Sequence, residues 1–106
     1  DSRLYNVCFD ETNMNYSNLS LASIENILFK NTGLKSANFQ ENKLKNIVFK
    51  DADLTSANFF KTSLKGVDLS DAIISGLNIS LEDIRGAEIG EYQAGDLLYL
   101  IGVKIK

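Results

Sequence analysis

Few side chains in this chain could perform covalent or acid–base chemistry. The 106 residues include no histidine, the commonest general base and metal ligand, and one cysteine, Cys8. Glu82 and Asp83 are adjacent but fit solvated surface positions better than an acid–base pair. There is no nucleophile–histidine pair, phosphate loop or metal-ligand cluster in the sequence. We therefore expect a protein that is not an enzyme and uses no cofactor or metal, with Cys8 as a plain surface thiol rather than a redox group.

The bulk composition narrows the class of partner. Fourteen acidic against eleven basic residues give a net charge of −3, so there is no basic field for direct nucleic-acid binding. A single cysteine excludes an intrachain disulfide and favours a cytoplasmic protein. No apolar run approaches the ~18 residues of a membrane span, and no signal peptide is visible. Because the chain starts at Asp1 inside a repeat, we interpret it as part of a longer protein.

One periodic pattern organises the chain. Every fifth residue is Leu, Ile, Phe or Met, eighteen times without interruption, and a period of five fits neither an α-helix nor a flat strand. These column residues, which we call centres, are Leu4, Phe9, Met14, Leu19, Ile24, Phe29, Leu34, Phe39, Leu44, Phe49, Leu54, Phe59, Leu64, Leu69, Ile74, Ile79, Ile84 and Ile89.

Each unit of five has the same order of chemistry. A small or apolar residue stands two before the centre, Asn or Asp often stands just before it, and two mainly polar residues follow, as in Ala37-Asn38-Phe39 and Ala57-Asn58-Phe59. Over residues 2–89 this pattern resembles the pentapeptide-repeat proteins. The resemblance implies an all-β solenoid, a right-handed quadrilateral β-helix in which four repeats form one coil. The centre and the residue two before it would point inward.

If residues twenty positions apart stack on one another, the sequence predicts which side chains form the core. Eighteen repeats make about four and a half coils, roughly 20 Å tall at the strand spacing of ~4.8 Å. All phenylalanine centres then fall on two opposed faces and should stack as a core ladder, whose members are Phe9, Phe29, Phe49, Phe39 and Phe59. Asn42 and Glu82 are exceptions to the small-residue rule. We expect Asn42 to bond neighbouring backbone and Glu82 to lie where the stack opens.

The repeat ends near Ile89, so we divide the chain into a β-helix at 1–89 and a C-terminal segment at 90–106. Residues 91–101 are expected to form a capping α-helix with Ala94, Leu97, Leu98 and Ile101 on one face, followed by a short strand at 103–106. This segment has more apolar residues than one cap needs, which predicts a homodimer contact. The expected contact residues are Tyr92, Leu98, Tyr99, Leu100, Val103 and Ile105.

The repeat also places the charges. The face centred on Phe9, Phe29 and Phe49 carries seven acids against Lys30 and Lys50, a net charge of −5. The neighbouring face has a net charge of +3, and another face carries a column of asparagines at 18, 38, 58 and 78. The acids of this expected partner-binding face are Asp10, Glu11, Asp51, Asp68, Asp71, Glu88 and Glu91.

The C-terminal segment narrows the functional expectation. Tyr92-Gln93-Ala94, Leu97-Leu98 and Ile101-Gly102-Val103 resemble the tail of the quinolone-resistance (Qnr-type) pentapeptide-repeat proteins. That resemblance implies a dimeric DNA mimic in the bacterial cytoplasm that binds DNA gyrase or topoisomerase IV and protects it from fluoroquinolones. No loop interrupts the register here, as in the loop-free members. The alternative is a structural or protein-interaction module with a different partner. Ice binding is disfavoured because the threonines form no regular array.

Overall fold

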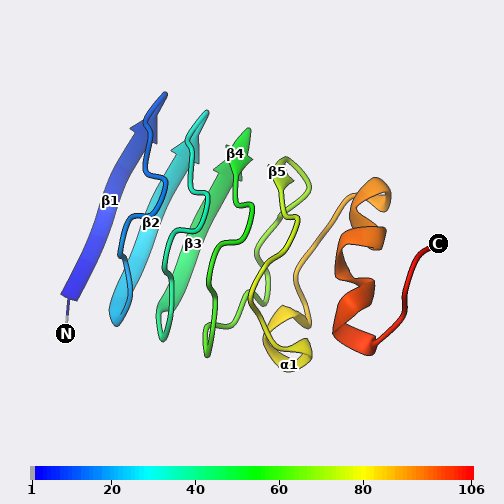
Figure 1. Cartoon of the computed structure of the whole chain (residues 1–106). Helices are drawn as coiled ribbons and strands as arrows, with labels where there is room; N and C mark the ends of the chain where they lie inside the picture. Colours follow the sequence, from blue (N-terminus) through cyan, green and yellow to red (C-terminus); the bar gives the residue numbers. More distant parts are fainter. Residues whose placement is uncertain (1) are drawn as a thin grey trace.

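A computed structural model describes residues 2–106, and Asp1 lies outside the described residues. Three long strands repeat along the chain, β1 (Ser2–Asp10), β2 (Ala22–Lys30) and β3 (Lys43–Lys50), and pair in parallel in the order β1-β2-β3. Two short strands, β4 (Ala52–Asp53) and β5 (Ala72–Ile73), form a second parallel pair. Figure 1 shows these elements stacked one behind another as successive coils.

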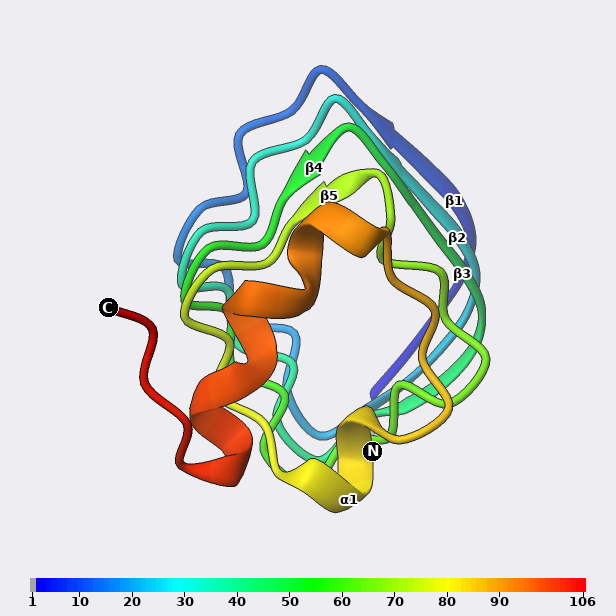
Figure 2. The same ribbon diagram turned by 90° about the vertical axis from the view of Figure 1, so that its right-hand side faces the viewer.

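The register of the coils is twenty residues throughout. Leu4 pairs with Ile24, which pairs with Leu44, and isolated bridges join Asn18 to Asn38 and Asn38 to Asn58. Viewed along its axis, the chain winds as stacked four-sided coils (Figure 2). The expected β-helix of pentapeptides is therefore confirmed.

The corners of the coil explain the polar positions of the repeat. At several corners the carbonyl of a centre accepts the N–H of the third residue on, as in Ala37 N to Leu34 O (3.1 Å) and Val67 N to Leu64 O (3.0 Å). The second residue after the centre takes a left-handed conformation, with φ of 54° at Ser36 and 79° at Gly66. A type II turn makes the same demand on its third residue, which is why asparagine and glycine recur at this position.

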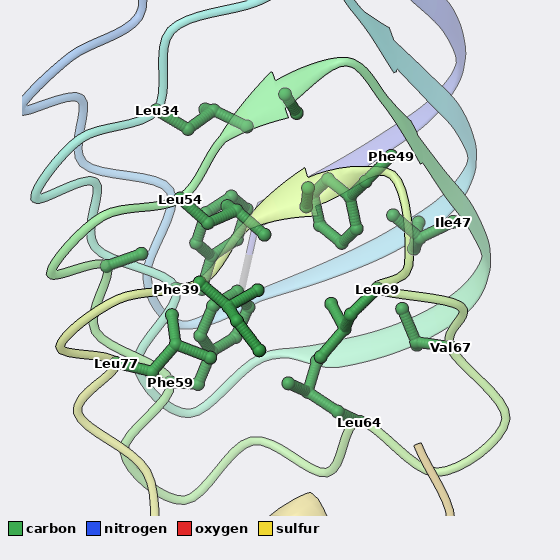
Figure 3. Packing of buried hydrophobic residues seen from close by; sticks show 14 of the residues in the cluster. Leu34, Phe39, Ile47, Phe49, Leu54, Phe59, Leu64, Val67, Leu69 and Leu77 are labelled. Atoms are coloured by element: carbon green, nitrogen blue, oxygen red, sulfur yellow. The ribbon is translucent and has the colours of Figure 1, made fainter. Parts of the chain in front are cut away.

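The centres fill the interior, as the repeat predicts, except for the last one, Ile89, which is 36% exposed where the repeat ends. Leu34, Phe39, Leu54, Phe59 and Leu64 have no exposed surface, and Figure 3 shows them converging. The phenylalanines stack in two columns along the axis. The ring centre of Phe29 lies 5.3 Å from the ring centres of both Phe9 and Phe49, and the ring centres of Phe39 and Phe59 are 4.8 Å apart. The columns meet edge to face, with 6.1 Å between the ring centres of Phe29 and Phe39. This arrangement suits the quadrupoles of the rings and leaves a dry core.

The two exceptional inward positions behave differently. Asn42 is buried, and its Oδ1 accepts the N–H of Ala22 one coil earlier at 3.0 Å. Glu82 is exposed because the last coil leaves the repeat geometry in a short helix, α1 (Leu81–Ile84). Ser80 caps this helix by accepting the N–H of Asp83 at 3.1 Å.

A helix crosses the open end of the last coil (Figure 2), but it differs from the expected one. The element η1 (Glu91–Ile101) is a 3-10 helix, not an α-helix. Ala94 and Ile101, expected on its inner face, are exposed, whereas Gln93 is buried and Leu97 and Leu100 pack against the core. The cause is Gln93, whose Nε2 donates to the carbonyls of Leu69 and Ala72 at 2.7 Å each and thereby fixes the face of the helix.

The strand expected at 103–106 is not formed in this chain. Gly102 ends η1 in the left-handed region with φ 76°, and the chain turns back so that Ile105 lies against Gly95. Residues 103–106 are exposed and have no strand partner within residues 2–106.

Phe39→Ala should lower the free energy of unfolding by about 3–5 kcal/mol, because it leaves a cavity between two stacked columns. Phe60→Ala is the matched control, since Phe60 is exposed and should cost about 0.5 kcal/mol or less. Urea unfolding followed by circular dichroism measures both. Equal losses for the two variants would contradict the inward assignment of the column.

Gln93→Glu should destabilise the fold by about 3 kcal/mol at neutral pH, because a carboxylate cannot donate to the carbonyls of Leu69 and Ala72. Burial raises the pKa of the new carboxyl above its unfolded value, so the deficit grows as pH rises through the folded pKa and shrinks in acid. Gln40→Glu is the control, since Gln40 Oε1 only accepts, from Asn58 Nδ2 at 3.4 Å. Thermal unfolding from pH 3 to pH 8 tests this; a pH-independent deficit would contradict it.

Candidate functional site

The seven acids of the expected partner-binding face are all exposed, but the structure divides them into two groups. Asp10 and Glu11 lie on the first coil, at the end of β1. The strand register then places Lys30 beside Asp10 and Lys50 beside Lys30. These two lysines separate the first group from the other five acids, so the face is not one continuous acidic stripe.

The remaining five acids form what we call the C-terminal acidic group: Asp51, Asp68, Asp71, Glu88 and Glu91. A backbone bridge joins Asp68 to Glu88, and Asp51 and Asp71 are related by the twenty-residue repeat. Glu91 begins η1 directly above the same coils. These five carboxylates lie on three successive coils, two coil steps from first to last.

Local hydrogen bonds keep one of these acids charged. Asp68 Oδ1 accepts the N–H of Ser70 at 2.9 Å, and the hydrogen bonds from Ser70 lower the pKa of the Asp68 carboxyl. Within residues 2–106, none of the seven acids of the face forms an ion pair. Their charge is therefore presented to solvent without neutralisation.

Three acids on the other faces are paired with lysines from nearby coils. Lys45 Nζ lies 3.3 Å from Glu25, Lys61 Nζ lies 3.9 Å from Glu41, and Lys35 Nζ lies 3.6 Å from Asp53. Burial opposes ionisation of Asp53, but hydrogen bonds from Thr55 and the charge of Lys35 outweigh it and lower its pKa. The seven acids of the expected partner-binding face thus differ from Glu25, Glu41 and Asp53 in having no lysine partner within residues 2–106.

The residues expected at a dimer contact fall into two sets. Leu98 is half-buried and Leu100 packs against the core, so both contribute to the cap. Tyr92 and Tyr99 expose their rings while their hydroxyls donate to the carbonyls of Ser70 and Leu77, and burial raises the pKa of the Tyr99 hydroxyl.

Beyond the tyrosines, the exposed apolar surface of the C-terminal segment consists of Ile101, Val103 and Ile105, with Ile105 69% exposed.

Amide ladders run along two lines of the solenoid. The expected asparagine column is present: Asn78 Nδ2 donates to Asn58 Oδ1 at 3.0 Å, and Asn58 donates to Asn38 at 3.2 Å. A second ladder, which our reading of the sequence missed, joins Asn6, Asn26 and Asn46 at 3.0 and 2.6 Å. Its spacing of twenty residues was the available signal. Both ladders stiffen the stack.

Other reactive groups are sparse on the surface. Cys8 is exposed and forms no disulfide. In the part of the chain that the structure describes, no cluster of three or more His, Cys, Asp or Glu side chains is arranged to hold a metal ion. None of the helices at 2–106 has the length and apolar character needed to cross a membrane.

Comparisons with known proteins bear on the repeat. No curated protein matches the chain. A trypsin-treated variant of QnrB1, described as a plasmid-mediated fluoroquinolone resistance protein, is a solved structure with 11% identity and a TM-score of 0.42, covering 99% of this chain and 90% of that one. The pentapeptide repeat protein Rfr23 from the cyanobacterium Cyanothece 51142 has 19% identity and a TM-score of 0.36, covering 85% of both chains.

The family comparison identifies the repeat itself. The model of the pentapeptide repeats matches residues 34–71 in eight copies. The twenty-residue register observed there continues into the coils on both sides. Residues 34–71 of this chain are therefore pentapeptide repeats of that family, set within a longer solenoid of the same register.

Proposed function

We propose that this protein is a non-enzymatic DNA mimic of the bacterial cytoplasm that binds a type II topoisomerase, DNA gyrase or topoisomerase IV, and protects it from fluoroquinolones. The observation that carries the proposal is the C-terminal acidic group, whose carboxylates project from one face of a rod without ion-pair partners. A rod with fixed, regularly spaced negative charge is what a DNA-binding groove is built to hold.

Charge density supports mimicry at one end of the rod. Duplex DNA carries about one negative charge per 1.7 Å, or about six over the ~10 Å that two fully paired coil steps would span. The five acids less Lys50 leave four net negative charges on that stretch. The whole face, with a net −5 over roughly 20 Å, is much more dilute than the dozen charges of DNA. The proposed contact therefore centres on the C-terminal coils.

The C-terminal motif gives independent support. The segment resembling the Qnr-type tail begins at Tyr92-Gln93-Ala94 and places its glutamine in the cap, beside the acidic group. A rigid cap at this end would keep the carboxylates in fixed positions, as electrostatic recognition requires.

A second candidate is an interaction module for a different protein. Lys30 and Lys50 interrupt the acids, and the column of Cys8, Leu28 and Val48 beside them is partly apolar, with Val48 exposed. A surface of mixed charge and apolar groups fits a protein partner that does not bind DNA.

Neutralising the acidic group should abolish topoisomerase protection. Asp68→Asn, Asp71→Asn and Glu88→Gln together remove three negative charges, so we expect at least roughly tenfold more protein to be needed to rescue gyrase supercoiling from ciprofloxacin. The matched control replaces Glu25, Glu41 and Glu82 by Gln, which changes the net charge equally on other faces. If both triple variants protect alike, or if the unaltered protein neither binds gyrase at low salt nor protects it, the proposal fails.

We also propose that two copies associate through the C-terminal segment. Exposed Tyr92, Ile101, Val103 and Ile105 lie on one short stretch after the repeat, and a monomer gains nothing from showing this surface to water. Self-association would bury it and present two acidic groups in one particle.

The double variant Val103→Asp and Ile105→Asp should be monomeric in light scattering, because two carboxylates would be desolvated at the contact. Phe60→Asp is the control; it adds a charge at an exposed aromatic residue on the asparagine face and should remain dimeric. A double variant that keeps the mass of the unaltered protein would refute the proposed contact.

A further inference from the structure

One seam between neighbouring coils is open. On the face of the long strands, β3 is the last strand of its sheet, and among residues 2–106 no backbone hydrogen bond or bridge joins 43–51 to 63–71. The same two coils stay paired elsewhere, with Leu54 N donating to Ile73 O and Phe59 N to Asn78 O, both at 2.8 Å. Residues 63–71 pair instead with the following coil, through Leu69 N to Glu88 O at 2.7 Å. The free edge of β3 therefore has no partner.

A cavity of about 470 Å³ lies at this seam and is lined by both of its sides. Its β3 side includes the inward residues Ile47 and Phe49, and its other side includes Val67. Asp68 and Asp71 stand at its margin together with Lys50 and Lys65. The cavity thus joins an unpaired strand edge, an apolar floor and charged margins.

The residues that face each other across the seam make it weaker than the seam between β2 and β3, where one like-charged pair, Lys30 and Lys50, stands beside an ion pair. Between β2 and β3, Glu25 lies opposite Lys45 and forms an ion pair at 3.3 Å. In the next step the repeat sets Lys45 opposite Lys65 and Asp51 opposite Asp71. Like charges in neighbouring strands are destabilising. The Asn6–Asn26–Asn46 ladder also stops here, because Gly66 follows in that column.

The missing strand has a recognisable sequence pattern. In the paired coils the corresponding stretch is Ile27-Leu28-Phe29-Lys30 and Ile47-Val48-Phe49-Lys50, with the first and third residues inward and lysine last. Residues 103–106, Val-Lys-Ile-Lys, follow the same order of apolar, variable, apolar and lysine. They are exposed and have no strand partner in their own chain.

We propose that residues 103–106 of a second copy insert as a parallel strand between β3 and residues 63–71. Val103 and Ile105 would enter the apolar floor, and Lys104 would lie beside Asp68. Lys106 would come opposite Lys50 in this register, and it would lie between Asp51 and Asp71, whose like charges it separates. The strand completes the hydrogen bonds of a free edge and separates its like charges, as in donor-strand complementation. Ile105, which is 69% exposed, would leave its place against Gly95.

The donor is a second copy because of where the segment lies. Figure 2 shows the C-terminal segment on the side of the coil opposite β1, β2 and β3, beyond the reach of four residues. The inference rests on the self-association proposed above, and it specifies the site that receives the segment.

Disulfide trapping tests the placement. In a Cys8→Ser background, a copy with Val48→Cys is mixed with a mass-tagged copy carrying Lys104→Cys and mildly oxidised. In the proposed register these positions are neighbours on adjacent strands, within the Cα range that a disulfide bridges. We expect the mixed dimer to form roughly tenfold faster than with Phe60→Cys, an exposed residue on another face, in place of Val48→Cys.

Hydrogen exchange gives a second readout without cysteines. Amides of 43–51 should gain protection as protein concentration rises, lose that gain in Ile105→Asp, and retain it in the control Phe60→Asp, which lies on another face, outside both the inserted segment and the proposed contact. Equal rates of disulfide trapping at positions 48 and 60 would overturn the insertion. Hydrogen exchange at 43–51 that does not change with protein concentration would also overturn it. If light scattering still gives a dimer in that case, the self-association proposal stands and only the proposed insertion site is wrong. If the unaltered protein is a monomer, both the self-association and the insertion are wrong.

Discussion

The backbone hydrogen bonds between coils are the constraint from which the structure follows. Each coil pairs its N–H and C=O groups with the next coil along most of its length, which fixes the coil at twenty residues. A single inserted residue would move inward side chains to the surface for the rest of the chain. The unbroken register is therefore a condition of the fold, and it sets like side chains above like: phenylalanine on phenylalanine and asparagine on asparagine.

That same stacking becomes unfavourable when the repeated residue is charged. The structure relieves it in two ways. Where opposite charges alternate along a column, as at Glu25 and Lys45, the coils are bridged. Where two like-charged pairs meet, Lys45 with Lys65 and Asp51 with Asp71, the strands separate, although the single pair of Lys30 and Lys50 leaves β2 and β3 paired. Charge order along a column thus contributes both to the cohesion of the seam and to the charge left for a partner.

The sequence predicted what depends on the period and missed what depends on pairs of side chains. The direction of the column, the stacked phenylalanines and the backbone-bonded Asn42 follow from position in the repeat, so they could be read from the chain. The 3-10 form of η1 and its inner face depend on Gln93 reaching two particular carbonyls, which no periodicity encodes. The twenty-residue repeat already places Lys30 and Lys50 between the two groups of acids. Summing the charges over the whole face concealed this division.

The left-handed corners carry a consequence for engineering. Tyr16, Leu21 and Lys61 hold φ between 56° and 64°, a conformation that costs such residues about 1–2 kcal/mol each. Neighbouring coils hold the corners in place, and the corner side chains point away from the axis, with Tyr16 78% exposed. Successive corners are one strand spacing apart, about 4.8 Å. The solenoid therefore acts as a molecular ruler, on whose edges chemical groups can be exchanged at fixed intervals without disturbing the interior.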